Sequence, residues 1–184
     1  MRKLVTLFLL LFLCLPSMVL ASTKQHTVAL CNMTPYKLFE KMQTDQPYLE
    51  VKNRLRFFDV HKVASSSELV FCKVGKDLPN CTMHISAFHS ASGLTQVVSI
   101  RVNNNTSAAQ DDFINASVLV FYELGFSLAD IDMLYKQGIP SPSYDNQMCS
   151  IWKNDRRIVV FSHFNSIGYR SVSFYAVNTP RYMR

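Results

Sequence analysis

The sequence predicts an α+β fold in which an antiparallel sheet of about seven strands, joined as meander hairpins, packs against two to three helices. Three observations support this class. Apolar and polar residues alternate over much of the chain, the connections between these segments are short enough to join only antiparallel neighbours, and two stretches have helical spacing with helix caps. Strands and helices in separate runs are typical of α+β domains.

The start of the chain has the composition of a secretory signal peptide. Basic residues precede an apolar stretch at residues 4–15, and small residues at 19–21 form a cleavage site. The apolar stretch is shorter than the roughly 20 residues of a membrane-spanning helix and is interrupted at Pro16. We therefore expect cleavage after Ala21, a periplasmic or secreted protein without stable membrane insertion, and one domain at residues 22–184.

Period-2 alternation gives the strands. Short breaks separate four expected strands, which should form a meander. They lie at residues 55–63, 68–74, 81–89 and 95–102. Three further strands are expected near the end of the chain, at residues 148–153, 157–164 and 169–177. No internal repeat is visible in the sequence.

Capping residues give the helices. Thr34 followed by Pro35 is a typical helix start, and we expect a short helix from there to residue 42. Ser107 and Gln110 have the spacing of a capping box, which predicts a helix at 108–124 with Phe121 on its apolar side. A shorter third helix and a rigid, proline-rich connector are expected next, at residues 127–138 and 139–143.

The exported part of the chain holds four cysteines: Cys31, Cys72, Cys81 and Cys149. An even number in an oxidising compartment predicts disulfides. A hairpin with a four-residue turn at 75–78 places Cys72 opposite Cys81 and collects neighbouring apolar residues on one face. We therefore predict a Cys72–Cys81 bridge and, by remainder, a Cys31–Cys149 bridge. The longer bridge closes the longer loop and should stabilise by nearly 5 kcal/mol, against about 2.5 to 3 kcal/mol for the shorter one.

The sequence lacks the usual patterns of catalytic and metal sites. The nucleophile elbow of serine hydrolases and the glycine-rich loops that bind phosphate are absent. No pair of histidines has the helical spacing of a zinc site, although a sheet can still bring together His61, His84 and His163. A solvated sheet face is the simpler explanation of these histidines, and we predict no catalytic residues, no metal and no cofactor.

The chain is basic, with a formal net charge of +6. Its densest basic clusters are Lys52, Arg54 and Arg56, and the pair Arg156 and Arg157. No zinc-finger, RNP or helix-turn-helix pattern accompanies them, so nucleic acid is not expected as a partner. We interpret these clusters as solvated surface, with weak attraction to anionic lipid, glycan or an acidic protein as the alternative.

Five Asn-x-Ser/Thr sequons occur in the sequence. Asn115 lies within a predicted helix and Asn80 directly precedes a cysteine that is predicted to be bridged. The other three are the better acceptors for a glycan in a eukaryotic or viral source: Asn32, Asn104 and Asn105. In a bacterial source these sequons carry no glycan.

These observations together predict a non-enzymatic exported domain that binds another exported or cell-surface protein, as an inhibitor or immunity protein does. The aromatic residues, thirteen Phe, eight Tyr and one Trp, concentrate in the strands, either as core or as a surface for the partner. We expect docking through a sheet face or edge. The alternatives are a secreted hydrolase that uses the strand histidines and a carrier of a small apolar ligand held between helices and sheet.

Overall fold

The computed structural model describes residues 29–47, 49–76, 83–103, 106–127, 129, 139–141, 147–153, 156–164 and 169–179, and within these it leaves the side chains of 139–141, 147–153 and 161–164 undescribed. The expected signal peptide lies outside the described residues, as does almost all of the third expected helix. Both stay predictions.

The described elements are two α-helices, one short 3-10 helix and eight strands. In chain order they are α2 (Pro35–Thr44), η1 (Val51–Asn53), β1 (Arg56–Lys62), β2 (Leu69–Gly75), β3 (Met83–His89), β4 (Thr95–Asn103), α3 (Ser107–Glu123), β5 (Ile139–Ser141), β6 (Gln147–Lys153), β7 (Arg157–Phe164) and β8 (Tyr169–Ala176).

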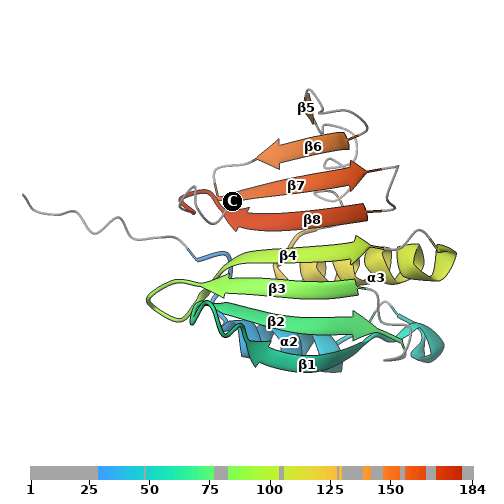
Figure 1. Cartoon of the computed structure of the whole chain (residues 1–184), viewed down its shortest axis with the longest axis horizontal. Helices are drawn as coiled ribbons and strands as arrows, with labels where there is room; N and C mark the ends of the chain where they lie inside the picture. Colours follow the sequence, from blue (N-terminus) through green and yellow to red (C-terminus); the bar gives the residue numbers. More distant parts are fainter. Residues whose placement is uncertain are drawn as a thin grey trace, which may run out of the picture.

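The strands form one antiparallel sheet with the order β1-β2-β3-β4-β8-β7-β6-β5 (Figure 1). The strands β1 to β4 are a meander that follows α2, and β5 to β8 are a second meander that follows α3. The two meanders meet where β4 pairs with β8, so the described elements repeat an arrangement of one helix and four strands that is not visible in the sequence. The edges of the sheet are β1 and β5.

The predicted α+β class and the antiparallel sheet are confirmed. All seven expected strands are present with boundaries that differ by at most two residues. The structure adds β5, a three-residue strand paired with β6 inside the segment expected to be a connector. Pro140 is tolerated there because β5 is an edge strand, where a missing N–H need not leave a partner unpaired.

Both helices begin at threonine caps. The hydroxyl of Thr34 accepts a hydrogen bond from the Lys37 backbone N–H, as expected for a start at Pro35. The cap of α3 is Thr106 rather than the expected Ser107, because Thr106 has extended backbone angles and its hydroxyl accepts from the Ala109 N–H. In the described part of the chain, neither helix combines the length and apolar character needed to cross a membrane.

The core lies between one face of the sheet and the two helices, which both lie behind the sheet in Figure 1. Helix α2 packs on β1 and β3, and α3 packs on β3 and β4. Phe121 is 1% exposed, which confirms its expected place in the core. The strand residues of this face are Val70, Cys72, Val74, Met83, Ile85, Ala87, Val98, Ile100, Val102, Val159, Val172 and Phe174.

The expected register of the β2–β3 hairpin is wrong. Cys72 lies opposite Ile85 and Val74 opposite Met83, so Cys72 is not paired with position 81. The observed register sets β2's buried side chains against buried Met83, Ile85 and Ala87, whereas the expected one set Cys72 and Val74 against Cys81 and Pro79. Cys81 lies outside the described residues, and the Cys72–Cys81 bridge stays a prediction without the register that suggested it.

The expected Cys31–Cys149 bridge is not formed, and the described part of the chain contains no disulfide. The Leu30 N–H donates to the Thr95 carbonyl at 2.8 Å, and the Thr95 N–H donates to the Met33 carbonyl at 2.9 Å, so the Cys31 segment lies beside Thr95. Cys31 is a free thiol. Cys149 is three strands away, in register with Arg101 through β7 and β8. Three strand spacings are about 14 Å, and six residues along β4 are about 20 Å. A disulfide requires Cα atoms within about 7 Å.

Candidate functional site

Two glutamines, Gln43 in the last turn of α2 and Gln46 just after the helix, hydrogen-bond to the backbone just before and within the edge strand β1. The Gln46 side chain accepts a hydrogen bond from the Leu55 N–H at 2.9 Å and donates one to the Leu55 carbonyl at 2.8 Å. The Gln43 side chain accepts from the Phe57 N–H at 3.0 Å. Gln46 is only 4% exposed. This glutamine clamp satisfies backbone groups that an edge strand would otherwise leave open.

A surface pocket of about 770 Å³ lies beside the glutamine clamp. Residues of α2, η1 and β1, of the segments next to them and of the bend after β2 line it: Gln43, Gln46, Val51, Lys52, Arg54, Leu55, Arg56, Phe57, Phe58 and Lys76. Four of the lining residues are cationic and none is acidic. We call it the basic pocket.

Two of the four cations have ion-pair partners among the described residues, and two have none there. Lys52 Nζ lies 2.8 Å from Glu50, in a pair whose side chains are both well exposed. Lys76 Nζ lies 3.8 Å from Asp112. Among the described residues, no ion pair is formed by Arg54 or Arg56, and both are exposed. Within the described part of the chain, both guanidinium groups can bind an anionic group, which arginine holds through two parallel hydrogen bonds.

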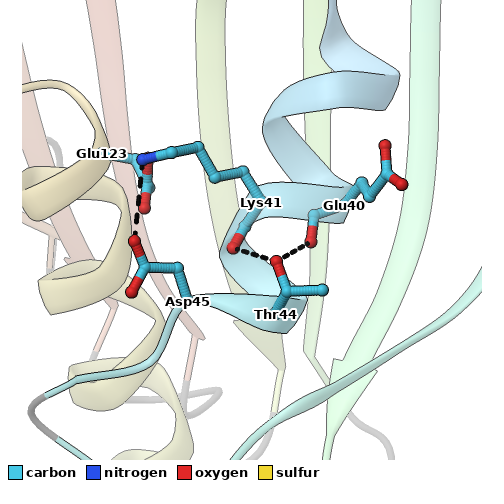
Figure 2. A network of polar contacts seen from close by, with 5 residues as sticks. All are labelled: Glu40, Lys41, Thr44, Asp45 and Glu123. Atoms are coloured by element: carbon cyan, nitrogen blue, oxygen red, sulfur yellow. Dashed lines mark hydrogen bonds and ion pairs between the residues drawn. The ribbon is translucent and has the colours of Figure 1, made fainter.

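An ion pair joins α2, which carries the glutamine clamp, to α3. Figure 2 shows Lys41 reaching from α2 toward the carboxylate of Glu123, and the two atoms are 2.5 Å apart. The Glu123 side chain is fully buried, and the pKa of Lys41 is raised chiefly by this hydrogen bond. Lys41 also lies 3.7 Å from Asp45, the residue after α2. The clamp is thus carried by a helix anchored to the core.

His61 and His84, the strand histidines of the candidate set whose side chains are described, lie on neighbouring strands around Phe71. His61 and His84 flank Phe71 on β1, β2 and β3, with ring centroids 5.6 and 5.1 Å from that of Phe71. Both imidazole rings thus pack against the Phe71 ring, and their backbones are two strand spacings apart, about 9.6 Å. His163 is in register with Arg170 of β8 and Val102 of β4. His84 is in register with Arg101, the residue before Val102, so the two histidines occupy alternate positions of the sheet. Among the described side chains, no group of three could hold a metal ion.

The other predicted site residues are scattered. Asn32 is exposed next to Cys31, and Asn104 and Asn105 lie outside the described residues. Burial raises the pKa of the Cys31 thiol, which makes it a poor nucleophile. The basic cluster Lys52, Arg54 and Arg56 was recognisable in the sequence as a charge cluster.

The glutamine clamp was missed by the sequence reasoning. A glutamine near a helix end has no characteristic pattern, because its role depends on which strand lies beside it. The clamp can be recognised only once the packing of α2 against β1 is known. Comparison of the chain with protein-family models, with curated proteins and with solved structures finds no match.

Proposed function

We propose that this chain is an exported, non-enzymatic binding domain that docks on an acidic surface of another exported or cell-surface protein through the basic pocket. The proposal rests on Arg54 and Arg56, two exposed arginines that form no ion pair among the described residues. The described residues that line the pocket include no carboxylate.

The setting of the arginines supports a binding role over a merely solvated surface. Arg54 and Arg56 stand on either side of Leu55, whose backbone Gln46 holds at both its N–H and its carbonyl. A segment fixed in this way loses less conformational entropy when a partner binds. Arginine is also enriched at the energetically dominant positions of protein interfaces, whereas lysine is depleted.

The experiment is an affinity capture from the exported proteins of the source, using the mature chain, the double variant Arg54→Glu/Arg56→Glu, and Lys37→Glu as a control. Lys37 is an exposed lysine of α2 that does not line the basic pocket. We expect the wild type and the control to retain the same acidic protein, and the double variant to retain it at least tenfold less. Binding of the purified pair should weaken as salt is raised.

Two results would overturn the proposal. The first is capture of the same proteins by all three chains, because the arginines would then play no part. The second is retention of RNA or anionic vesicles by the wild type, lost in the double variant, with no protein partner. Circular dichroism of each chain establishes that the charge reversals leave the fold intact.

A further inference from the structure

A second, smaller hollow lies beside the basic pocket along the same edge of the molecule. It has a volume of about 330 Å³ and is lined by Tyr36, Phe39, Glu40, Gln43, Phe57 and Val60. Gln43 and Phe57 line both hollows. The hydrogen bond between them therefore forms part of the wall that the two hollows share. We call the second one the apolar hollow.

Exposed apolar side chains gather around these two hollows. In the described part of the chain, four large apolar side chains are exposed: Tyr36, Val51, Val60 and Ile114. Tyr36 and Val60 line the apolar hollow, Val51 lines the basic pocket, and only Ile114 lies elsewhere, on α3. Apolar surface concentrated beside a polar, charged site is typical of a protein interaction surface rather than of scattered solvent-exposed residues.

The β1 edge here does not suit the addition of a strand from a partner. The glutamine clamp already occupies the N–H groups of Leu55 and Phe57. Beyond Phe58 the register shifts, and Asp59 has a φ of 51°, which marks a bulge. Bulges and occupied edge groups both oppose strand addition. A partner must therefore be recognised by its side chains at the two hollows.

Building on the proposed function, we infer that the partner presents an acidic side chain close in sequence to an aromatic or large aliphatic one. The acidic group binds Arg54 and Arg56 in the basic pocket, while the apolar group enters the apolar hollow against Tyr36 and Val60. Glu40, the one acidic residue in that lining, disfavours a second acidic group there, so the acidic group of the partner binds in the basic pocket.

The inference is tested with defined peptides on the full mature chain, by fluorescence anisotropy. The probes are tetraglutamate, tetraglutamate with phenylalanine added at either end, and a phenylalanine peptide with lysine in place of glutamate. We expect one of the two phenylalanine–glutamate peptides to bind roughly tenfold more tightly than tetraglutamate, as a buried aromatic anchor does. The lysine peptide should not bind.

Variants separate the two hollows. Val60→Asp and, independently, Tyr36→Ala should remove the tenfold gain and leave tetraglutamate binding unchanged, whereas Ile114→Asp, an exposed control on α3, should change neither. Equal affinity for all acidic peptides, or the same loss in Ile114→Asp as in Val60→Asp, overturns the inference and leaves the proposed function standing. Failure of every acidic peptide to bind, together with capture that Arg54→Glu/Arg56→Glu does not reduce, overturns the proposed function itself.

Discussion

The covered face of the sheet and its β1 edge are both held by α2, but by different chemistry. On the covered face α2 buries Leu38, Phe39 and Met42, each worth roughly 1.5 to 3 kcal/mol. At the edge, Gln43 of α2 and Gln46 just after it form the glutamine clamp, whose individual hydrogen bonds are worth about 0.5 to 1.5 kcal/mol. The apolar face supplies stability, and the polar edge supplies a fixed shape for the basic pocket. Substitutions should separate the two.

The largest effect is expected on the covered face, from Phe121→Ala. The Phe121 ring packs edge-on against Phe126 and Phe174, with centroids 5.2 and 4.9 Å away. Its truncation leaves a cavity and should lower the free energy of unfolding by about 3 to 5 kcal/mol. Urea denaturation measures this, with exposed Ile114→Ala as a control that should change stability by less than about 0.5 kcal/mol. Equal effects of the two substitutions would show that Phe121 is not in the core.

At the β1 edge, Gln46→Leu should cost less stability but damage the pocket. Leucine keeps the approximate volume and leaves both the N–H and the carbonyl of buried Leu55 without their partner. Two unsatisfied buried groups at about 1 to 3 kcal/mol each sum to about 2 to 6 kcal/mol, and we expect a loss in the lower part of this range, about 2 to 3 kcal/mol, because leucine adds apolar burial in place of the amide. Gln46→Glu keeps the acceptor for the N–H, but it sets a carboxylate oxygen against the Leu55 and Gln43 carbonyl oxygens in a buried site, so it should lose at least as much. Denaturation curves that match the wild type would show that water replaces the clamp.

The Phe121 and Gln46 positions illustrate how much of the fold could be predicted from the sequence. Strands and helices follow from local periodicity and caps, which is why all seven expected strands are present and Phe121 is buried. Periodicity does not determine register when two registers differ by an even number of residues, because both keep the same face inward. The Cys72 partner was misassigned for this reason.

Contacts between segments far apart in the sequence could not be predicted from local sequence patterns. The pairing of β4 with β8 sets the distance between Cys31 and Cys149, and no turn or alternation encodes it. The basic residues of the candidate site were visible as a cluster, but their conversion into a pocket depends on Gln43 and Gln46 reaching β1 from another element. A glutamine side chain that hydrogen-bonds to backbone changes neither the charge pattern nor the hydropathy pattern of the sequence, so these patterns do not predict it.

The ion pair between the helices offers a smaller, asymmetric effect. Lys41→Met leaves the buried Glu123 carboxylate without its cation, whereas Glu123→Gln leaves a half-exposed lysine that water can solvate. We expect Lys41→Met to cost about 1 to 2 kcal/mol and Glu123→Gln less than half of that. An equal cost for both substitutions would contradict a buried, charged Glu123.

The smallest effect is a pH dependence at the face of the sheet that carries His84. The pKa of His84 is lowered, first by burial of its ring and then by the charge of Arg101. The unfolded chain therefore binds more protons at this position than the folded one once the pH falls below the ordinary histidine value of about 6.5. Stability from this group is complete above that value and is lost as the pH falls through the lower pKa of the folded state. Urea denaturation at a series of pH values measures the slope of the free energy of unfolding against pH. This slope should be weaker in His84→Gln than in the wild type. Arg101→Gln should weaken it only in part, because burial is the larger cause. An undiminished slope in His84→Gln would assign the pH dependence to other groups.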